Sequence, residues 1–375
     1  MRFKKIIRNI HLWFGLSSGL IVVFLGLTGC ILAFEVEIRN WTEDFRKVIP
    51  ENRSFLPPSQ LKTIANKHLT SGMALGIEYP GKDKAAIAPY YDSLHYELLF
   101  LNPYTGEVLQ HKNMKKDFFR IVIDGHFYLW LPPHIGQPIV ATATLMFVIL
   151  MISGLILWWP KSKVGLKQRF SIKWNAKWRR VNYDLHNVLG FYMTWVAIFI
   201  AISGLAFGFE WVAKSIYFVS SGGEQMAPHE HPHSDSTQPL QHASMADYLW
   251  QQHLPQIKTN ESMAVYFAHT KEDPLEVVIN HQPGTYYNSD FYHYDQYSGK
   301  ELEATGSYAG KFATAKLADK IVRMNYDIHV GAVLGLPGKI MAFLASLLAA
   351  SLPITGFIIW WGRRKKKAVK TSASS

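Results

Sequence analysis

Four histidines occupy positions at which an imidazole could bind a metal ion. His11 and His186 each open a long apolar run, "HLWFGLSSGLIVVFLGLTG" and "HNVLGFYMTWVAIFIAISG". In both runs a Gly follows the His by four residues, and a Thr-Gly or Ser-Gly pair closes the run. His126 and His329 each stand in an Asp-x-His motif, shortly before a proline and another apolar run. An ionisable side chain at membrane depth indicates a functional site, so these four are the candidates.

Imidazoles from facing helices can supply both axial ligands of a haem iron in the core of a helical bundle. The matching surroundings pair His11 with His186, and His126 with His329, as equivalent positions of a duplicated unit. Glycines such as Gly15 would let helices approach a flat macrocycle closely. We therefore predict two haems, with His11, His186, His126 and His329 binding the haem irons.

Two points about the second pair stay open at this level. His134 lies nearer the second apolar run than His126 and is an alternative ligand, although the fourth run has no matching His. The aspartates of the Asp-x-His motifs, Asp124 and Asp327, could orient the histidines through hydrogen bonds. They could equally cap the local helices.

A further set of histidines lies in a polar, Pro- and Gly-rich stretch at 220–244. His229, His231 and His233 form His-x-His-x-His, a spacing that can bind copper or zinc weakly. A solvated loop explains the same residues. The single cysteine, Cys30, excludes a disulfide framework and any Cys-ligated zinc or iron–sulfur site.

The elements that must position these histidines are long apolar helices. Charged residues make up only 18% of the 375 residues and aromatic residues 14%, which is unusual for a soluble protein. Four apolar runs, at about 12–34, 138–159, 188–209 and 339–361, are long enough to span a bilayer, which takes about 20 residues. We predict four transmembrane helices.

The positive charge is concentrated beside these runs. Segments 1–10, 160–182 and 362–375 hold 18 of the 39 Lys and Arg residues and no Asp or Glu. Such flanks mark the cytoplasmic side of a membrane, which places both termini there and the segments 39–120 and 212–325 outside. The net charge of +11 is therefore explained by topology, and nucleic-acid binding is excluded.

The two halves of the chain follow one pattern. The second and fourth runs both close on Ser/Thr-Gly, apolar residues, Trp-Trp and basic residues. The outside segments both combine an amphipathic helix with strands, and "YELLFLNPYTGEVLQ" and "DFYHYDQYSGKELEA" both read as hairpins with Gly in the turn. The fold class is thus membrane α-helical: two tandem repeats of helix, α+β domain and helix, related by an axis along the membrane normal.

The His-x3-Gly openings, the Asp-x-His motifs, the Ser/Thr-Gly-x-I-x-W-W closures and the Tyr-Thr/Ser-Gly turns together resemble the PepSY-associated transmembrane helix family. The resemblance covers nearly the whole chain. Members include inner-membrane reductases of ferric siderophores that carry b-type haem. It implies a bacterial inner-membrane protein that passes electrons through two haems to a periplasmic ferric siderophore or another Fe(III) chelate, releasing iron for uptake.

The resemblance makes both outside segments PepSY-like periplasmic domains. The expected parts are a cytoplasmic start and first helix at 1–38, domain one at 39–120, an interfacial stretch and second helix at 121–160, a basic loop at 161–183, a third helix at 184–211, domain two at 212–325, an interfacial stretch and fourth helix at 326–361, and a basic tail at 362–375.

The electron donor must be a separate molecule. No Gly-x-Gly-x-x-Gly motif stands between a strand and a helix, and the cytoplasmic segments are too short to fold around NADPH or a flavin. A quinol or a cytoplasmic reductase is the expected donor. Two other functions fit the same architecture: a non-enzymatic, membrane-anchored binding or regulatory protein with PepSY domains, and a permease.

Overall fold

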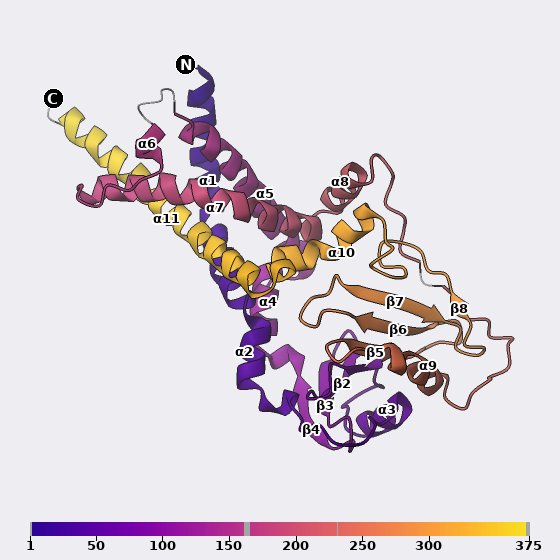
Figure 1. Cartoon of the computed structure of the whole chain (residues 1–375). Helices are drawn as coiled ribbons and strands as arrows, with labels where there is room; N and C mark the ends of the chain where they lie inside the picture. The colour runs from indigo at the N-terminus through magenta and orange to yellow at the C-terminus, as the bar shows by residue number, and fades with distance from the viewer. Residues whose placement is uncertain (1, 161–165, 231, 373–375) are drawn as a thin grey trace. The chain divides into compact units, whose positions relative to one another are not determined.

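The chain folds into two compact units, each built from separate stretches of the sequence (Figure 1). The structure is a computed structural model, and it describes residues 2–160, 166–230 and 232–372. The helical unit comprises Met1–Phe34, Val122–Ala213 and Ile328–Ser375, and the sheet unit comprises Glu35–Ile121 and Lys214–Asp327. The segments predicted to lie outside the membrane thus form one unit, and the apolar segments form the other.

Four long helices form the helical unit and are long and apolar enough to cross a membrane. They are α1 (Arg2–Leu32), α5 (Pro133–Trp158), α7 (Trp178–Gly208) and α11 (Gly335–Ser372). These helices confirm the predicted spans and make the chain a membrane protein. Each begins before its apolar run, because a helix satisfies backbone groups that would otherwise enter the hydrocarbon unpaired.

Small residues let these helices pack closely. A Cβ built on Gly26 of α1 would lie 2.7 Å from the carbonyl oxygen of Ser346 on α11. A Cβ on Gly208 of α7 would lie 2.6 Å from the methyl group of Ala141 on α5. Close approach through small residues is the usual way in which helices associate in lipid. The helices that carry His11 and His186 are therefore held at fixed positions.

Shorter helices complete the described chain. Helices α4 (Phe118–Tyr128) and α10 (Leu317–His329) end with His126 and His329 in their last turns. Leu129 and Trp130, directly after α4, have φ angles of 54° and 57°, which is uncommon for residues with a side chain. The remaining short α-helices are α2 (Glu35–Thr42), α3 (Pro58–Asn66), α6 (Leu166–Arg169), α8 (Glu210–Ser220) and α9 (Met245–His253).

The sheet unit is one antiparallel sheet of eight strands in the order β4-β3-β2-β1-β5-β6-β7-β8. The strands are β1 (Gly76–Tyr79), β2 (Ala86–Tyr91), β3 (Tyr96–Leu101), β4 (Val108–Asn113), β5 (Ser262–Tyr266), β6 (Leu275–Asn280), β7 (Ser289–Tyr294) and β8 (Glu301–Leu302). Helices α3 and α9 cover the same face, where Leu61 and Leu249 are fully buried against alternate strand residues.

The two outside segments meet in the middle of this sheet, because β1 pairs with β5. The sequence treats them as two domains, whereas the structure joins them edge to edge, which removes two exposed sheet edges. Both predicted hairpins are present, β3–β4 and β7–β8. Gly106 and Gly299 in their turns have φ angles of 76° and 68°, which a glycine adopts without strain.

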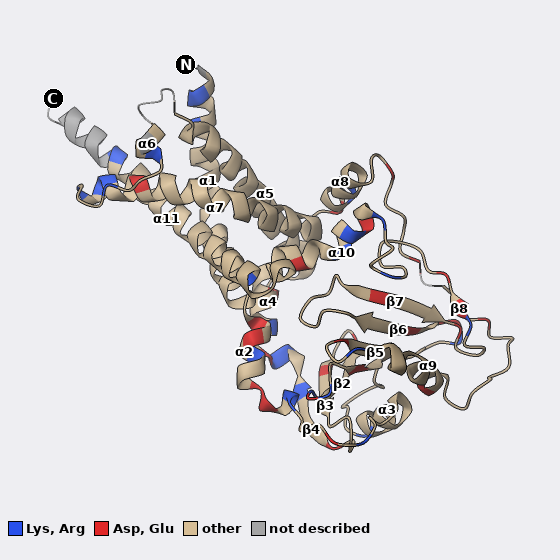
Figure 2. Cartoon of the chain, viewed as in Figure 1, with Lys and Arg blue, Asp and Glu red and all other residues tan. Residues whose placement is uncertain are grey.

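The charges of the helical unit are distributed as the sequence indicates. Lys and Arg gather at the end that carries the N-terminus and α6 (Figure 2). Residues 161–165 of the predicted basic loop and 373–375 of the predicted tail lie outside the described residues. The described remainder of these flanks carries the expected excess of basic side chains.

Candidate functional site

The helical unit brings the four predicted histidines together in two pairs. The rings of His11 on α1 and His186 on α7 have centroids 6.4 Å apart and planes at 89°. The rings of His126 on α4 and His329 on α10 have centroids 6.1 Å apart and planes at 68°. His134 is exposed in the first turn of α5, so His126 is the residue that faces His329.

Each of the four imidazoles is held at Nδ1 by a hydroxyl group from another helix. In the first pair, the Nδ1 atoms of His11 and His186 lie 2.8 and 2.9 Å from the hydroxyl oxygens of Ser153 and Thr355. In the second pair, the hydroxyl oxygens of Thr28 and Ser203 lie 2.7 and 3.1 Å from Nδ1 of His126 and His329. One hydrogen-bond arrangement thus occurs four times.

The second bond of each hydroxyl determines which imidazole nitrogen carries the proton. Thr28, Ser153, Ser203 and Thr355 all donate their hydroxyl proton to a carbonyl oxygen of their own helix. A hydroxyl has one proton, so toward the imidazole its oxygen must accept. Nδ1 is therefore the protonated nitrogen of each ring, and Nε2 carries the lone pair. His329 Nδ1 also lies 2.9 Å from the carbonyl oxygen of Ile200, which requires the same tautomer.

A glycine beside each hydroxyl makes room for the ring. A Cβ on Gly154 would lie 3.4 Å from Cε1 of His11, and one on Gly356 would lie 3.2 Å from Cε1 of His186. The equivalent distances are 3.7 Å from Gly29 to His126 and 2.9 Å from Gly204 to His329. The Ser/Thr-Gly pair therefore works as a unit, in which the hydroxyl orients the imidazole and the glycine leaves space for it.

The spacing of the rings fits an iron bound between them. Metal–imidazole bonds of about 2 Å place two ligating nitrogens about 4 Å apart and the ring centroids about 6 Å apart. The observed centroid distances are 6.4 and 6.1 Å. The residues present therefore fit the haem predicted from the sequence.

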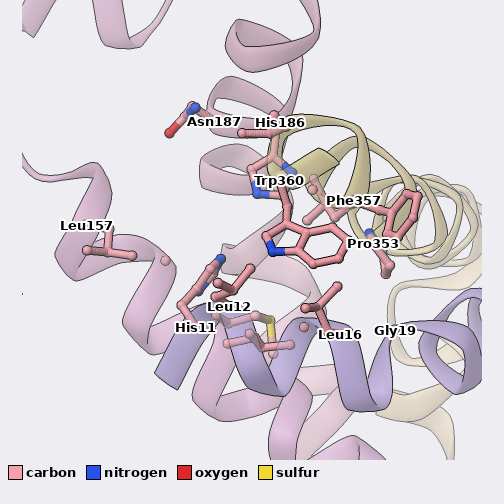
Figure 3. Close-up of a pocket in the computed structure, with 18 of the residues that line it drawn as sticks. His11, Leu12, Leu16, Gly19, Leu157, His186, Asn187, Pro353, Phe357 and Trp360 are labelled. Atoms are coloured by element: carbon pink, nitrogen blue, oxygen red, sulfur yellow. The ribbon is translucent and has the colours of Figure 1, made fainter. Parts of the chain in front are cut away.

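A cavity of about 790 Å³ opens beside the first pair. This volume lies within the range of about 300–1,000 Å³ typical of cofactor sites. Both His11 and His186 line it, with Trp360, Phe357 and other apolar side chains around them (Figure 3). Its polar lining is Arg8, Asn9, Tyr183, Asn187, Thr194 and Arg363, and no Asp or Glu of the described chain contributes. Apolar walls with a few polar groups suit a flat hydrophobic cofactor.

Comparison with known families agrees with this architecture. The family model described as PepSY-associated TM region matches residues 8–363. The chain belongs to this family. A search of curated protein sequences finds no match. The stretch matched by the PepSY-associated TM region includes all four paired histidines and the four hydroxyl residues that hold them.

The described residues of the His-rich segment at 220–244 do not form a metal site. Nδ1 of His229 lies 3.2 Å from the carbonyl oxygen of Thr305, and His233 is exposed. His231, the middle residue of the predicted motif, lies outside the described residues. Within the described chain, no group of three or more His, Cys, Asp and Glu side chains could hold a metal ion.

The aspartate of the second Asp-x-His motif has a different role from those expected. The Asp327 carboxylate accepts hydrogen bonds from the backbone N–H groups of Tyr286 and Tyr287, in the β6–β7 connection. It lies near the end of α10, so it neither caps the start of that helix nor contacts Nδ1 of His329.

The four hydroxyl residues belong to the candidate site, and their place in it was not predicted from the sequence. Their signal was present, because all four Ser/Thr-Gly pairs recur at matching places in the apolar runs. The pattern indicated a repeat but not a function. Only the packing of α1 against α5 and α4, and of α7 against α11 and α10, shows that each hydroxyl faces an imidazole.

Proposed function

We propose that this protein is a di-haem b electron-transfer protein of a bacterial inner membrane, and that it reduces ferric siderophore or another Fe(III) chelate in the periplasm. The observation that carries the proposal is the paired imidazoles. In each pair both Nδ1 atoms are held by hydroxyl oxygens, and the ring centroids lie 6.4 and 6.1 Å apart, a spacing that fits a metal bound by both rings.

Two protein ligands per site favour haem over a bare metal ion. A structural zinc takes four protein ligands and a catalytic zinc three, and no such group exists in the described chain. A haem iron already has four nitrogens from the macrocycle and needs only two axial imidazoles. Bound haem would supply reversible one-electron chemistry between ferric and ferrous iron.

The two pairs are well separated along the membrane-spanning helices. On α1, His11 belongs to one pair and Thr28, which holds His126, belongs to the other. Thr28 follows His11 by seventeen positions of α-helix, a rise of roughly 25 Å, close to the thickness of the hydrocarbon core. This separation supports one redox site near each face of the bilayer.

We place the basic flanks in the cytoplasm and the sheet unit in the periplasm, since an excess of Lys and Arg marks the inner side. One electron from a quinol or a cytoplasmic reductase would enter at the His11–His186 site. It would leave from the His126–His329 site and reduce one Fe(III) to Fe(II). Hard oxygen ligands bind the lower charge less strongly, which frees the iron from its chelator.

The first test is haem stoichiometry in the full chain purified from haem-replete cells. We expect two b-type haems per chain and two transitions in an optical redox titration. His11→Ala and His186→Ala should each remove the same haem, and His126→Ala and His329→Ala the other. His134→Ala should retain both. A colourless protein, or loss of both haems or neither in a single variant, would contradict the proposal.

The second test concerns the acceptor. The dithionite-reduced protein, freed of excess reductant, is mixed with ferric siderophore and a chromogenic chelator specific for ferrous iron. We expect one Fe(II) for each haem reoxidised, and no siderophore-dependent reoxidation in His126→Ala. Haem that stays reduced with every Fe(III) chelate tested would limit the function to electron transfer with a different acceptor.

A further inference from the structure

The cavity beside His11 and His186 carries two guanidinium groups at its mouth. Arg8 of α1 and Arg363 of α11 both line it, and both side chains are exposed. In the described part of the chain, neither arginine forms an ion pair with an Asp or Glu. Asp184 of α7 forms its ion pair with Arg180 instead. Two unneutralised cations beside an apolar cavity indicate a ligand that brings its own negative charges.

Helical spacing directs both guanidinium groups to the cavity. Arg8 precedes His11 by three residues, and Arg363 follows Gly356 by seven, and Gly356 lies against the ring of His186. Residues three and seven apart share one face of an α-helix. Each arginine therefore lies on the face of its helix that meets the paired imidazoles.

The positive charge is confined to one side of the cavity. Helices α1 and α11 pack directly, since a Cβ on Gly19 would lie 3.1 Å from Cβ of Pro353. The opposite side contributes neutral polar groups from Tyr183 and Asn187 of α7, and mainly apolar side chains from α5. A ligand with both negative charges on one edge matches this arrangement.

We infer that Arg8 and Arg363 bind the two propionate carboxylates of the haem held by His11 and His186. This inference rests on the proposed function. The propionates of a b-type haem project from the same edge of the macrocycle, and their charges would be costly against apolar walls. A guanidinium group matches a carboxylate with two parallel hydrogen bonds. The arginines thereby orient the macrocycle with its carboxylate edge toward the ends of α1 and α11.

Phosphate groups of anionic lipids offer the same oxyanion chemistry, so the test removes charge from the haem itself. Full-length apoprotein carrying His126→Ala, which leaves one site, is titrated with haem and with its dimethyl ester. A hydrogen bond to a charged group contributes enough that we expect the free acid to bind about tenfold or more tightly than the ester. In R8Q/R363Q the preference for the free acid over the ester should fall below about twofold, because the guanidinium groups that bind the carboxylates are gone. The four affinities form a double-mutant cycle, which isolates the interaction between the arginines and the carboxylates.

Matched variants complete the test. R8K/R363K keeps both charges and should retain most of the preference for the free acid. This variant keeps the test usable if R8Q/R363Q folds poorly. R364Q should retain all of it, because Arg364 does not line the cavity and stacks on Trp360 at 4.6 Å. An equal preference for the free acid in wild type and R8Q/R363Q would overturn the inference and leave the proposed function standing. Loss of co-purified anionic lipid in that variant would then assign the arginines to the bilayer.

Absence of any haem binding in the wild-type chain is a separate outcome. It would overturn the proposed function, and the present inference with it.

Discussion

The smallest repeated part of the candidate site is a hydroxyl, a glycine and an imidazole. The hydroxyl donates its proton to a carbonyl oxygen of its own helix, so its oxygen accepts from the Nδ1–H group of the imidazole. Because a hydroxyl has only one proton, the imidazole is the tautomer protonated at Nδ1. An acceptor at Nδ1 also makes Nε2 a stronger ligand. The same arrangement occurs four times in the helical unit.

Removal of one hydroxyl should weaken one site. In Thr355→Val the Nδ1–H of His186 loses its acceptor while the volume of the side chain is kept. Loss of such a supporting hydrogen bond typically costs about 10–100-fold in metal affinity. We expect that loss in haem affinity, together with a raised midpoint potential, at the His11–His186 site only.

The control is Thr144→Val on α5, whose hydroxyl donates only to the carbonyl of Val140. Haem titration and a redox titration check both variants. An unchanged affinity and potential in Thr355→Val would show that the hydroxyl does not support the ligand.

Two glycines of the second pair provide a matched steric test. A methyl group at Gly204 would lie 2.9 Å from Cε1 of His329 and force the ring to move, whereas one at Gly29 would make an ordinary contact of 3.7 Å with His126. We expect Gly204→Ala to lose haem from this site and Gly29→Ala to retain it, as measured by the haem-to-protein ratio. Equal retention in both variants would contradict the close fit of His329.

At the scale of elements, a buried ionic network joins separate segments of the sheet unit. Arg39 of α2 donates to both carboxylate oxygens of Asp117 and to Glu35 and Glu43. Lys112 of β4 contacts the same Asp117 at 2.6 Å. These charges compensate one another, so removing one partner leaves a buried charge without its counter-ion.

Arg39→Met should therefore destabilise the sheet unit strongly. Loss of one member of a buried ion pair costs about 3–5 kcal/mol. The control Lys47→Met removes an exposed pair with Asp44 and should cost at most about 1 kcal/mol. Chemical denaturation in detergent, followed by near-ultraviolet circular dichroism, compares the two. Similar losses in both variants would show that the network is not a stabilising element.

The same network predicts a loss of stability in acid. Burial alone would raise the pKa of Asp117, but hydrogen bonds from Arg39 and Lys112 hold the pKa well below its usual range. The unfolded chain therefore takes up the proton first as the pH falls, so the contribution of Asp117 is complete above about pH 4 and decreases below it. Denaturation between pH 3 and pH 7 should show this decrease in wild type and a smaller one in Asp117→Asn.

At the scale of the whole molecule, the chain separates the paired histidines from the sheet. All four paired histidines belong to the helical unit, and all eight strands belong to the sheet unit. This division fits an electron path within the membrane and an acceptor-binding part outside it. It requires that both ends of the chain lie on one side of the bilayer and the sheet on the other.

Single-cysteine labelling tests this topology, because the only native cysteine, Cys30, is buried and can be replaced first. We expect Lys5→Cys and Lys173→Cys to react with an impermeant maleimide only from the cytoplasmic side. Lys258→Cys, at a side chain that is 84% exposed, should react only from the periplasmic side. Labelling of Lys258→Cys and Lys5→Cys from the same side would exclude the proposed direction of electron transfer.

The sequence by itself determined the membrane-spanning helices, the hairpins of the sheet unit and the identity of the paired histidines. These features depend on local chemistry: an apolar run of sufficient length, a glycine that a turn requires, and an ionisable side chain where lipid penalises it. The matching surroundings of His11 and His186 were enough to predict that they meet, and their rings do face each other.

Only the tertiary structure decided what holds the imidazoles and how the outside segments combine. The choice of His126 over His134, the Ser and Thr acceptors, and the binding of Asp327 to a strand connection all depend on which helices and loops are neighbours. The joining of β1 to β5 pairs strands nearly two hundred residues apart in the sequence. A hydrogen bond between distant segments leaves no periodicity in the sequence, because its partner is set by packing and not by spacing along the chain.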